Sequence, residues 1–168
     1  MKALVLEEYG KFAYRDAPDP KPYAPDEVLV RVRAVGICGS DVHGMDGSTG
    51  RRQPPLIMGH EAAGEIAALG PAARAAGWKE GDRVTFDSTV WCGECVACRS
   101  GDVNLCDNRK VLGVSCDEYK LDGAFAEYVV VPARILFRLP EGLSFKLAAM
   151  AEPVGVAMHA ASLPRLKP

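Results

Sequence analysis

The sequence predicts a mainly β domain that carries a small cysteine-rich lobe and ends in helices. Several stretches show the strand-like alternation of apolar and polar residues, four cysteines crowd into residues 92–106, and the last stretch is rich in alanine. The 168 residues, 48% hydrophobic and 25% charged, suit one globular domain with a sizeable core. We therefore expect one domain over residues 1–168, with the lobe at 88–110 and helices at 144–163.

The clearest strand pattern lies near the N-terminus. Residues 1–14 predict a hairpin that turns at Gly10-Lys11, and prolines hold residues 16–25 extended. From residue 26 to residue 35, valines on one face alternate with arginines and other residues on the opposite face, which predicts a strand. The chain then enters residues 36–44, where glycines bracket polar groups, as is typical of a ligand site.

Further strands are expected along the rest of the chain. They lie at residues 62–69, 83–86, 123–132 and 135–139. We expect the first of these to follow a bend at Gly59 and to bend again near Gly64, because glycine permits such turns. Residues 71–78 are interpreted as a connector.

The C-terminal stretch predicts two helices. Ser144 is a suitable N-cap for a short helix that ends near residue 149, and Pro153 suits the first position of a second helix that ends near residue 163. The second helix is apolar around most of its circumference, so it needs cover on several sides. The sequence stops five residues later, so we expect that cover to be missing here.

The cysteine-rich lobe has the spacing of a metal site. Short gaps separate its four thiols, so backbone turns can aim them at one ion; they belong to Cys92, Cys95, Cys98 and Cys106. Four thiolates around zinc make a closed, structural site with no position for a substrate. Disulfides and an iron–sulfur cluster are the alternatives, although nothing at the N-terminus indicates the oxidising compartment that disulfides need. Cys116 is left over as an unpaired thiol.

Charge and composition argue against several classes of protein. The formal net charge is −2, and acidic residues interrupt the cysteine cluster at Glu94, Asp102 and Asp107, which disfavours a nucleic-acid-binding zinc ribbon. The apolar run Ala3–Leu6 is stopped by two glutamates and is too short for a signal peptide or membrane span. We expect a cytoplasmic protein that binds neither nucleic acid nor membranes.

A second constellation of metal-binding residue types is spread along the chain. Cys38 follows a strand, His60 and Glu61 follow Gly59 before another strand, and Glu152 precedes a helix. Loop positions at strand ends are where a β scaffold can direct side chains to one ion. Each residue also has a simpler interpretation, because cysteine is often a small buried hydrophobe and glutamate often a solvated or helix-capping charge.

The motifs around these residues resemble a known family. They are Gly36-Ile-Cys-Gly-Ser-Asp-Val-His43, Gly59-His-Glu61, the four-cysteine lobe, Asp122-Gly-Ala-Phe-Ala-Glu-Tyr128 and Glu152-Pro-Val-Gly-Val-Ala157. Together, in this order, they resemble the catalytic domain of zinc-dependent medium-chain dehydrogenases, particularly the sorbitol and other polyol dehydrogenases. The resemblance covers essentially the whole chain, and it implies a GroES-like, mainly antiparallel β barrel with a zinc-bearing lobe.

The resemblance implies roles for the second constellation. Cys38 and His60 correspond to catalytic zinc ligands, and Glu61 to a ligand or its close partner. Alcohol dehydrogenases of the family have a cysteine where this chain has Glu152, and polyol dehydrogenases have a glutamate that binds zinc directly or through water. An ion held in this way keeps a coordination position for the substrate.

Three polar residues near Cys38 correspond to the family's proton-transfer machinery. Ser40 and His43 match the positions of a proton relay, and Asp41 matches the carboxylate that orients the zinc-binding histidine. Without the resemblance, Ser40 and Asp41 would be ordinary turn residues and His43 an exposed loop histidine.

The chain lacks the G-x-G-x-x-G turn with which a Rossmann domain binds NAD(P). In the resembling family, that domain begins just after the position of Pro168, and the family is usually oligomeric. We therefore expect the zinc- and substrate-binding half of a polyol or secondary-alcohol dehydrogenase, inactive alone with NAD. The alternative is a stand-alone zinc-binding module used for structure or interaction.

Substrate identity is expected to depend on the loops at residues 44–55 and 112–120. Arg51-Arg52 in the first loop could receive a phosphorylated sugar alcohol, but a solvated basic pair is the simpler interpretation.

Overall fold

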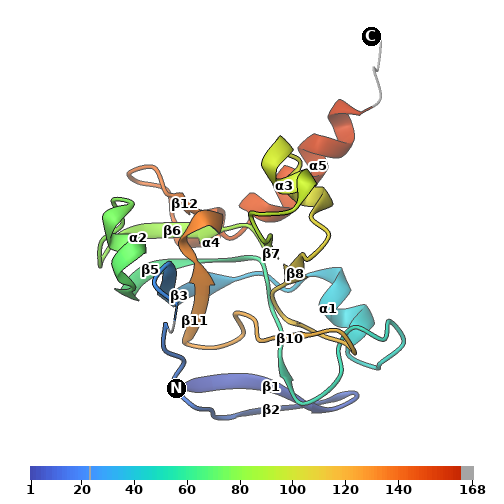
Figure 1. Cartoon of the computed structure of the whole chain (residues 1–168). Helices are drawn as coiled ribbons and strands as arrows, with labels where there is room; N and C mark the ends of the chain where they lie inside the picture. The colour runs from blue at the N-terminus through green and yellow to red at the C-terminus, as the bar shows by residue number, and fades with distance from the viewer. Residues whose placement is uncertain (23, 164–168) are drawn as a thin grey trace.

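Two antiparallel sheets form the body of the protein in the computed structural model, which describes residues 1–22 and 24–163 (Figure 1). The smaller sheet has the order β2-β1-β4, from β1 (Lys2–Glu8), β2 (Lys11–Asp16) and β4 (Leu56–Ile57). The predicted hairpin is therefore confirmed. Leu4 N–H donates to the carbonyl of Phe125 at 2.8 Å, and this bond ties the hairpin to the segment that leads into the larger sheet.

The larger sheet has five strands in the order β11-β3-β5-β6-β12. They are β3 (Glu27–Val35), β5 (Ala62–Leu69), β6 (Arg83–Phe86), β11 (Tyr128–Pro132) and β12 (Leu136–Arg138). All neighbours pair antiparallel. The ladder between β3 and β5 shifts register beside Gly64, where a side chain would lie 2.1 Å from the carbonyl oxygen of Arg31. The strands expected at 62–69 and 83–86 are confirmed, whereas those expected at 123–132 and 135–139 are shorter than predicted. The register shift agrees with the expected second bend.

Alternation along the strands explains the main core. Val28 and Val30 are fully buried, whereas Arg31 and Arg33 on the opposite face of β3 are exposed, as predicted. Their buried partners come from every strand of the large sheet and from its connections: Ala62, Ile66, Val84, Phe86, Leu112, Val129, Val131, Ile135 and Leu136. This packing makes the large sheet the rigid part on which the connecting loops are mounted.

The cysteine-rich lobe projects from the end of β6 (Figure 1). It contains β7 (Thr89–Val90), α3 (Val96–Ser100), the 3₁₀ turn Val103–Leu105 and β8 (Lys110–Val111). Beyond it, β9 (Val114–Ser115) and β10 (Lys120–Leu121) form a two-stranded ribbon, and a second 3₁₀ turn, Ala133–Ile135, connects β11 to β12.

Several helices differ from the sequence-based expectation. The expected connector at 71–78 contains α2 (Pro71–Ala75), and the glycine-rich bend contains α1 (Gly39–Gly44). Ser144 caps α4 (Phe145–Ala148) as predicted, since its hydroxyl accepts the N–H of Leu147. The last helix, α5 (Ala151–Ser162), begins two residues before Pro153, which is compatible with proline because N–H groups in a first turn have no helical partner.

As expected, the described residues leave α5 without cover. None of its residues is buried, and it extends away from the sheets (Figure 1). Among the helices that the structure describes, none combines the length and apolarity needed to cross a membrane.

Candidate metal centres

Two groups of metal-binding side chains gather within the described part of the chain. In the lobe, the sulfurs of the four cysteines lie within 4.8 Å of one another, and those of Cys92 and Cys98 are 3.9 Å apart. Four sulfurs arranged tetrahedrally at the usual zinc–sulfur bond length would be separated by about 3.8 Å. The spacing therefore fits one zinc ion in a closed, structural site.

The same distances weigh against the two alternatives for the lobe. All six cysteines of the chain are free thiols, so the disulfide interpretation is wrong. In an iron–sulfur cluster the thiolates bind different iron atoms, which would set them further apart than ligands of a single ion.

Backbone N–H groups prepare the lobe thiols for an ion. Hydrogen bonds from the N–H groups of Glu94 and Cys95 lower the pKa of Cys92 to about 6. N–H groups of Cys98 and Asp107 likewise lower the pKa of Cys95, whereas partial burial raises that of Cys98 to about 12. The lobe is therefore poised to begin binding with Cys92 as a thiolate.

Cys38, His60 and Glu61 form the second group, and their ligand atoms also lie within 4.8 Å of one another. Antiparallel pairing explains why, because Val35 at the end of β3 is opposite Ala62 at the start of β5. The residues just outside this pair must therefore meet at one end of the large sheet. His60 and Glu61 are both 7% exposed and Cys38 is partly buried, so the group lies in the wall of the fold.

A clamped turn lets His60 and Glu61 share this site although they are neighbours. Gly59 has a φ of +88°, in the left-handed region that glycine tolerates, as the predicted bend requires. The loop that follows β10 holds this turn, since Ala124 N–H donates to the Gly59 carbonyl at 2.8 Å. The motif that begins at Asp122 thus contributes to the site by fixing the backbone before His60.

Gly36 leaves room for Glu61. Its N–H donates to the Glu61 carbonyl at 2.7 Å, and a Cβ at this position would lie 2.3 Å from Oε2 of the Glu61 carboxylate. Its φ lies outside the left-handed region, so steric space rather than backbone conformation demands glycine here.

Asp41 connects two of the metal-binding residues. It is 3% exposed; Oδ2 accepts the N–H of Cys38 at 3.2 Å, and Oδ1 lies 3.5 Å from Nδ1 of His60. A carboxylate facing Nδ1 leaves Nε2 as the nitrogen for an ion. Burial alone would lower the pKa of His60, but Asp41 and Cys38 together raise it to about 9, so an ion would take the place of a proton there.

Buried polar atoms without partners around Asp41 indicate whether the second ligand group suits a cation. Within the described chain, three buried side-chain polar atoms lack a hydrogen-bond partner: Asp41 Oδ1, His60 Nδ1 and Arg52 Nε. All three belong to one cluster, although buried polar atoms are normally satisfied. With an ion on Nε2, His60 is neutral and Nδ1 carries the hydrogen that points to Asp41. Thiolate, imidazole and carboxylate together are zinc-binding donors, so the residues fit the ion.

The two relay candidates lie on α1, immediately after Cys38. Ser40 and His43 are both exposed and three residues apart, so they share one side of the short helix. Their role in proton transfer stays a prediction.

Glu152 is not among the residues that gather at the second group. It lies in the first turn of α5, and its Oε1 accepts a hydrogen bond from Ser88 Oγ at 3.3 Å. Whether it completes the metal site is untested by this geometry, and its role stays a prediction.

Arg52 is a participant that sequence reasoning missed. The expectation of a solvated pair is wrong for this residue, because Arg52 is only 6% exposed whereas Arg51 is exposed. The Arg52 Nη2 atom lies 3.7 Å from Asp41 Oδ1 and 3.4 Å from Ser40 Oγ. The only signal in the sequence was the basic pair itself, which does not reveal which arginine points inward.

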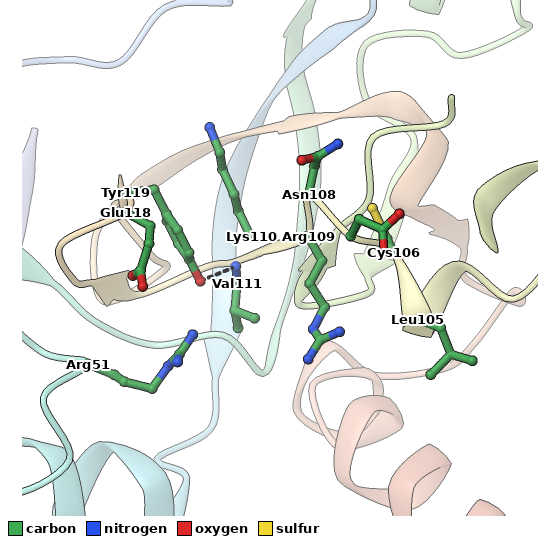
Figure 2. Close-up of a pocket in the computed structure, with 10 residues that line it drawn as sticks. Arg51, Leu105, Cys106, Asn108, Arg109, Lys110, Val111, Glu118 and Tyr119 are labelled. Atoms are coloured by element: carbon green, nitrogen blue, oxygen red, sulfur yellow. Dashed lines mark hydrogen bonds between the residues drawn. The ribbon is translucent and has the colours of Figure 1, made fainter. Parts of the chain in front are cut away.

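A cavity beside the lobe includes the lobe ligand Cys106 in its lining but lies apart from the second ligand group. It has a volume of about 450 Å³, and Figure 2 shows Arg51 and Arg109 on opposite sides of it, with the Tyr119 hydroxyl accepting the N–H of Val111. Both loops expected to determine the substrate contribute to its lining, but Cys38, His60 and Glu61 do not.

Comparison with known proteins places these features in a family. The profile described as alcohol dehydrogenase GroES-like domain matches residues 24–141. The chain is 40% identical to sorbitol dehydrogenase of Bacillus subtilis, covering 100% of this chain and 46% of that protein. It is 42% identical to L-threonine 3-dehydrogenase of Pyrococcus horikoshii, covering 83% and 38%.

A solved structure shows the same fold. Alcohol dehydrogenase from Thermus sp. ATN1 superposes with a TM-score of 0.89 at 32% identity, covering 100% of this chain and 49% of that one. The chain thus spans about half the length of the curated relatives it matches. The profile match, the shared fold and the zinc-binding geometry together show that the chain belongs to the GroES-like domain family of zinc-dependent alcohol dehydrogenases.

Proposed function

We propose that this chain is the zinc- and substrate-binding domain of an NAD(P)-dependent dehydrogenase that oxidises a polyol or secondary alcohol to a ketone. One observation carries the proposal: a thiol, an imidazole and a carboxylate converge at the end of the β3–β5 pair, with Asp41 directed at the imidazole. Three protein donors around zinc leave a position for a substrate, unlike the four thiols of the lobe.

Each residue of the second group has a proposed task. Cys38, His60 and Glu61 hold the zinc ion, which when bound supplies Lewis acidity toward the substrate hydroxyl. Asp41 fixes the tautomer and orientation of His60, because its Oδ1 lies 3.5 Å from Nδ1 and is placed to accept a hydrogen there once an ion occupies Nε2. Glu152 is proposed as a further partner of the site, directly or through a water molecule.

Proton removal is assigned to α1. Ser40 Oγ accepts the proton of the substrate hydroxyl and passes its own toward His43, which exchanges it with solvent because it is exposed.

Hydride transfer requires NAD(P), which we propose is carried by a Rossmann domain that acts together with this domain. The relatives support that arrangement through their length, since this chain covers 46% of the sorbitol dehydrogenase. Sorbitol and L-threonine, named in two relatives, both carry secondary hydroxyl groups, which supports secondary alcohols as the substrate class.

A chimeric enzyme tests the proposal. This chain would replace the matching 46% of the Bacillus subtilis sorbitol dehydrogenase, and NADH formation would be followed with polyols, simple secondary alcohols and L-threonine. We expect activity with at least one polyol or secondary alcohol. Cys38→Ala should abolish that activity, whereas Cys116→Ala, which alters the thiol outside both groups, should retain it. A folded, zinc-loaded chimera that oxidises none of these alcohols would contradict the proposal.

A further inference from the structure

We propose that Arg52 is a positioning residue of the second metal centre: its buried guanidinium holds Asp41 and Ser40 in their working orientations from beneath α1. The inference rests on the proposed function, because it takes a divalent cation to bind at Cys38, His60 and Glu61. It adds a residue to the site that lies outside the ligands and the relay.

The fold contains a prepared channel for this side chain. Arg52 passes under the end of α1 at Gly44, where a Cβ would lie 2.5 Å from Cγ of the arginine. Gly44 does not have a left-handed φ, so the space it leaves serves the arginine rather than the backbone. A side chain that needs a glycine opposite it has little freedom to turn elsewhere.

The backbone on both sides of Arg52 is also fixed. Ser115 N–H donates to the carbonyl of Arg51 at 3.2 Å, and Gln53 N–H donates to the carbonyl of Ser115 at 3.0 Å. Arg52 itself forms an isolated parallel bridge with Ser115. The loop that contains Arg52 is thereby attached to β9, and the guanidinium enters the site from an anchored segment.

Charge explains why a cation belongs there. With the ion bound, Cys38, Glu61 and Asp41 each contribute a negative charge, whereas the divalent ion contributes two positive charges. Arg52, with a side chain 7% exposed, supplies the third positive charge at 3.7 Å from Asp41 Oδ1. Since an uncompensated buried charge is costly, the guanidinium balances the charge of the ion, Asp41 and the two anionic ligands that the structure brings together.

Geometry gives Arg52 a second effect, on Ser40. Nη2 donates to Ser40 Oγ at 3.4 Å, so one lone pair of the hydroxyl oxygen is occupied. The hydroxyl hydrogen must then point away from Arg52, toward the exposed side of α1. Because a guanidinium has two terminal nitrogens, Nη2 can face Asp41 and Ser40 while Nη1 donates to the Arg51 carbonyl at 3.1 Å, which the single nitrogen of an ammonium group does less well.

Cobalt(II) titration of the full chain tests this role without relying on activity. Thiolate-to-cobalt absorption reports each site, and the lobe is an internal control because its four ligands make no contact with Arg52 that the structure shows. We expect Arg52→Met to weaken cobalt binding at Cys38, His60 and Glu61 by about 10- to 100-fold, as is usual when a residue that supports a metal ligand is lost. Arg52→Lys should recover part of the loss. Arg51→Met, which changes the adjacent exposed arginine, should bind like the wild type.

A second variant keeps the proposal testable if Arg52→Met does not fold. Gly44→Ala retains the guanidinium but pushes it from its channel, and it should weaken the same site while the lobe binds normally. The decisive variant is Arg52→Met if it folds, and Gly44→Ala if it does not. Cobalt affinity and absorption like those of the wild type at this site, in that variant, would overturn the role of Arg52. A wild-type chain that binds cobalt only in its lobe would instead overturn the proposed function.

Discussion

The two candidate metal centres of this domain are built on opposite principles. The lobe takes all four ligands from residues 92–106 and surrounds them with little apolar material; Val96 is 81% exposed and Leu105 is 61% exposed. The second centre takes its ligands from two distant segments that the large sheet brings together, and its His60 and Glu61 are buried against a packed core.

The contrast shows where the organising energy of each centre comes from. In the lobe, the ion itself must supply most of the cohesion, because few buried side chains are available to do so. In the second centre, the β3–β5 ladder, the clamped Gly59 turn and Asp41 set the geometry before any ion arrives. A metal site whose ligands are held by the surrounding fold can leave a coordination position open. A lobe that the ion itself holds together needs protein ligands at all four positions.

Removing the metal should produce the largest difference in local stability between the lobe and the large sheet. We expect a chelator to unfold residues 88–110 locally, so that their amide hydrogens exchange close to the rate of an unfolded peptide, while β3 and β5 keep their protection. Hydrogen exchange read by mass spectrometry, with and without chelator, measures this difference. Equal protection of the lobe in both conditions would contradict the view that the ion is its core.

Substituting one ligand in each centre should produce unequal damage to the fold. Cys95→Ser should release the lobe ion and reproduce the local unfolding, whereas Cys38→Ala should release only the other ion and cost about 1 kcal/mol of unfolding free energy. Metal content by elemental analysis and chemical denaturation check the two outcomes. Loss of both ions in Cys38→Ala would show that the centres are not independent.

A methyl group at Gly36 should weaken metal binding at the second centre alone. Gly36→Ala is expected to displace the Glu61 carboxylate and weaken metal binding at the second centre by about tenfold, with no effect on the lobe. Gly39→Ala is the matched control, because a Cβ there meets nothing within 4 Å. Isothermal titration with zinc compares the variants, and equal affinities for the two would argue against a role for Glu61 at the ion.

The relay residues should have the smallest structural effect. In the chimeric enzyme, Ser40→Ala is expected to lower kcat by about 100-fold, within the usual range for a lost proton-transfer group. His43→Ala should have a smaller effect, because the side chain is exposed and water can take the proton instead. Steady-state kinetics with a fixed polyol measures both. A larger loss for His43→Ala than for Ser40→Ala would reverse the proposed order of transfer.

The two centres could be predicted from the sequence to different extents, because their ligands are separated by different lengths of chain. Local spacing was enough for the lobe, since its ligands lie within fifteen residues, and period-two alternation was enough for β3. The second group could be assembled only through the family resemblance, because strand pairing brings Cys38 beside His60 over a long separation. Arg52 was assigned to the surface, because nothing local reveals the channel that Gly44 provides.

The helices show a related limit. Proline at position 153 was interpreted as the first helical residue, although any position in the first turn suits it, and α5 begins at Ala151. The apolar character of α5 indicates a surface that needs a covering partner, and the described residues leave it exposed as expected, but the helix pattern does not identify that partner.

Anomalous diffraction from a crystal of the zinc-loaded chain is the most direct test of the central claim. The account predicts two zinc peaks per chain. One should have four sulfur ligands in the lobe, and the other should lie among Cys38 Sγ, His60 Nε2 and a Glu61 oxygen, with one coordination position held by solvent. A single peak in the lobe, or a second ion fully enclosed by protein ligands, would contradict it.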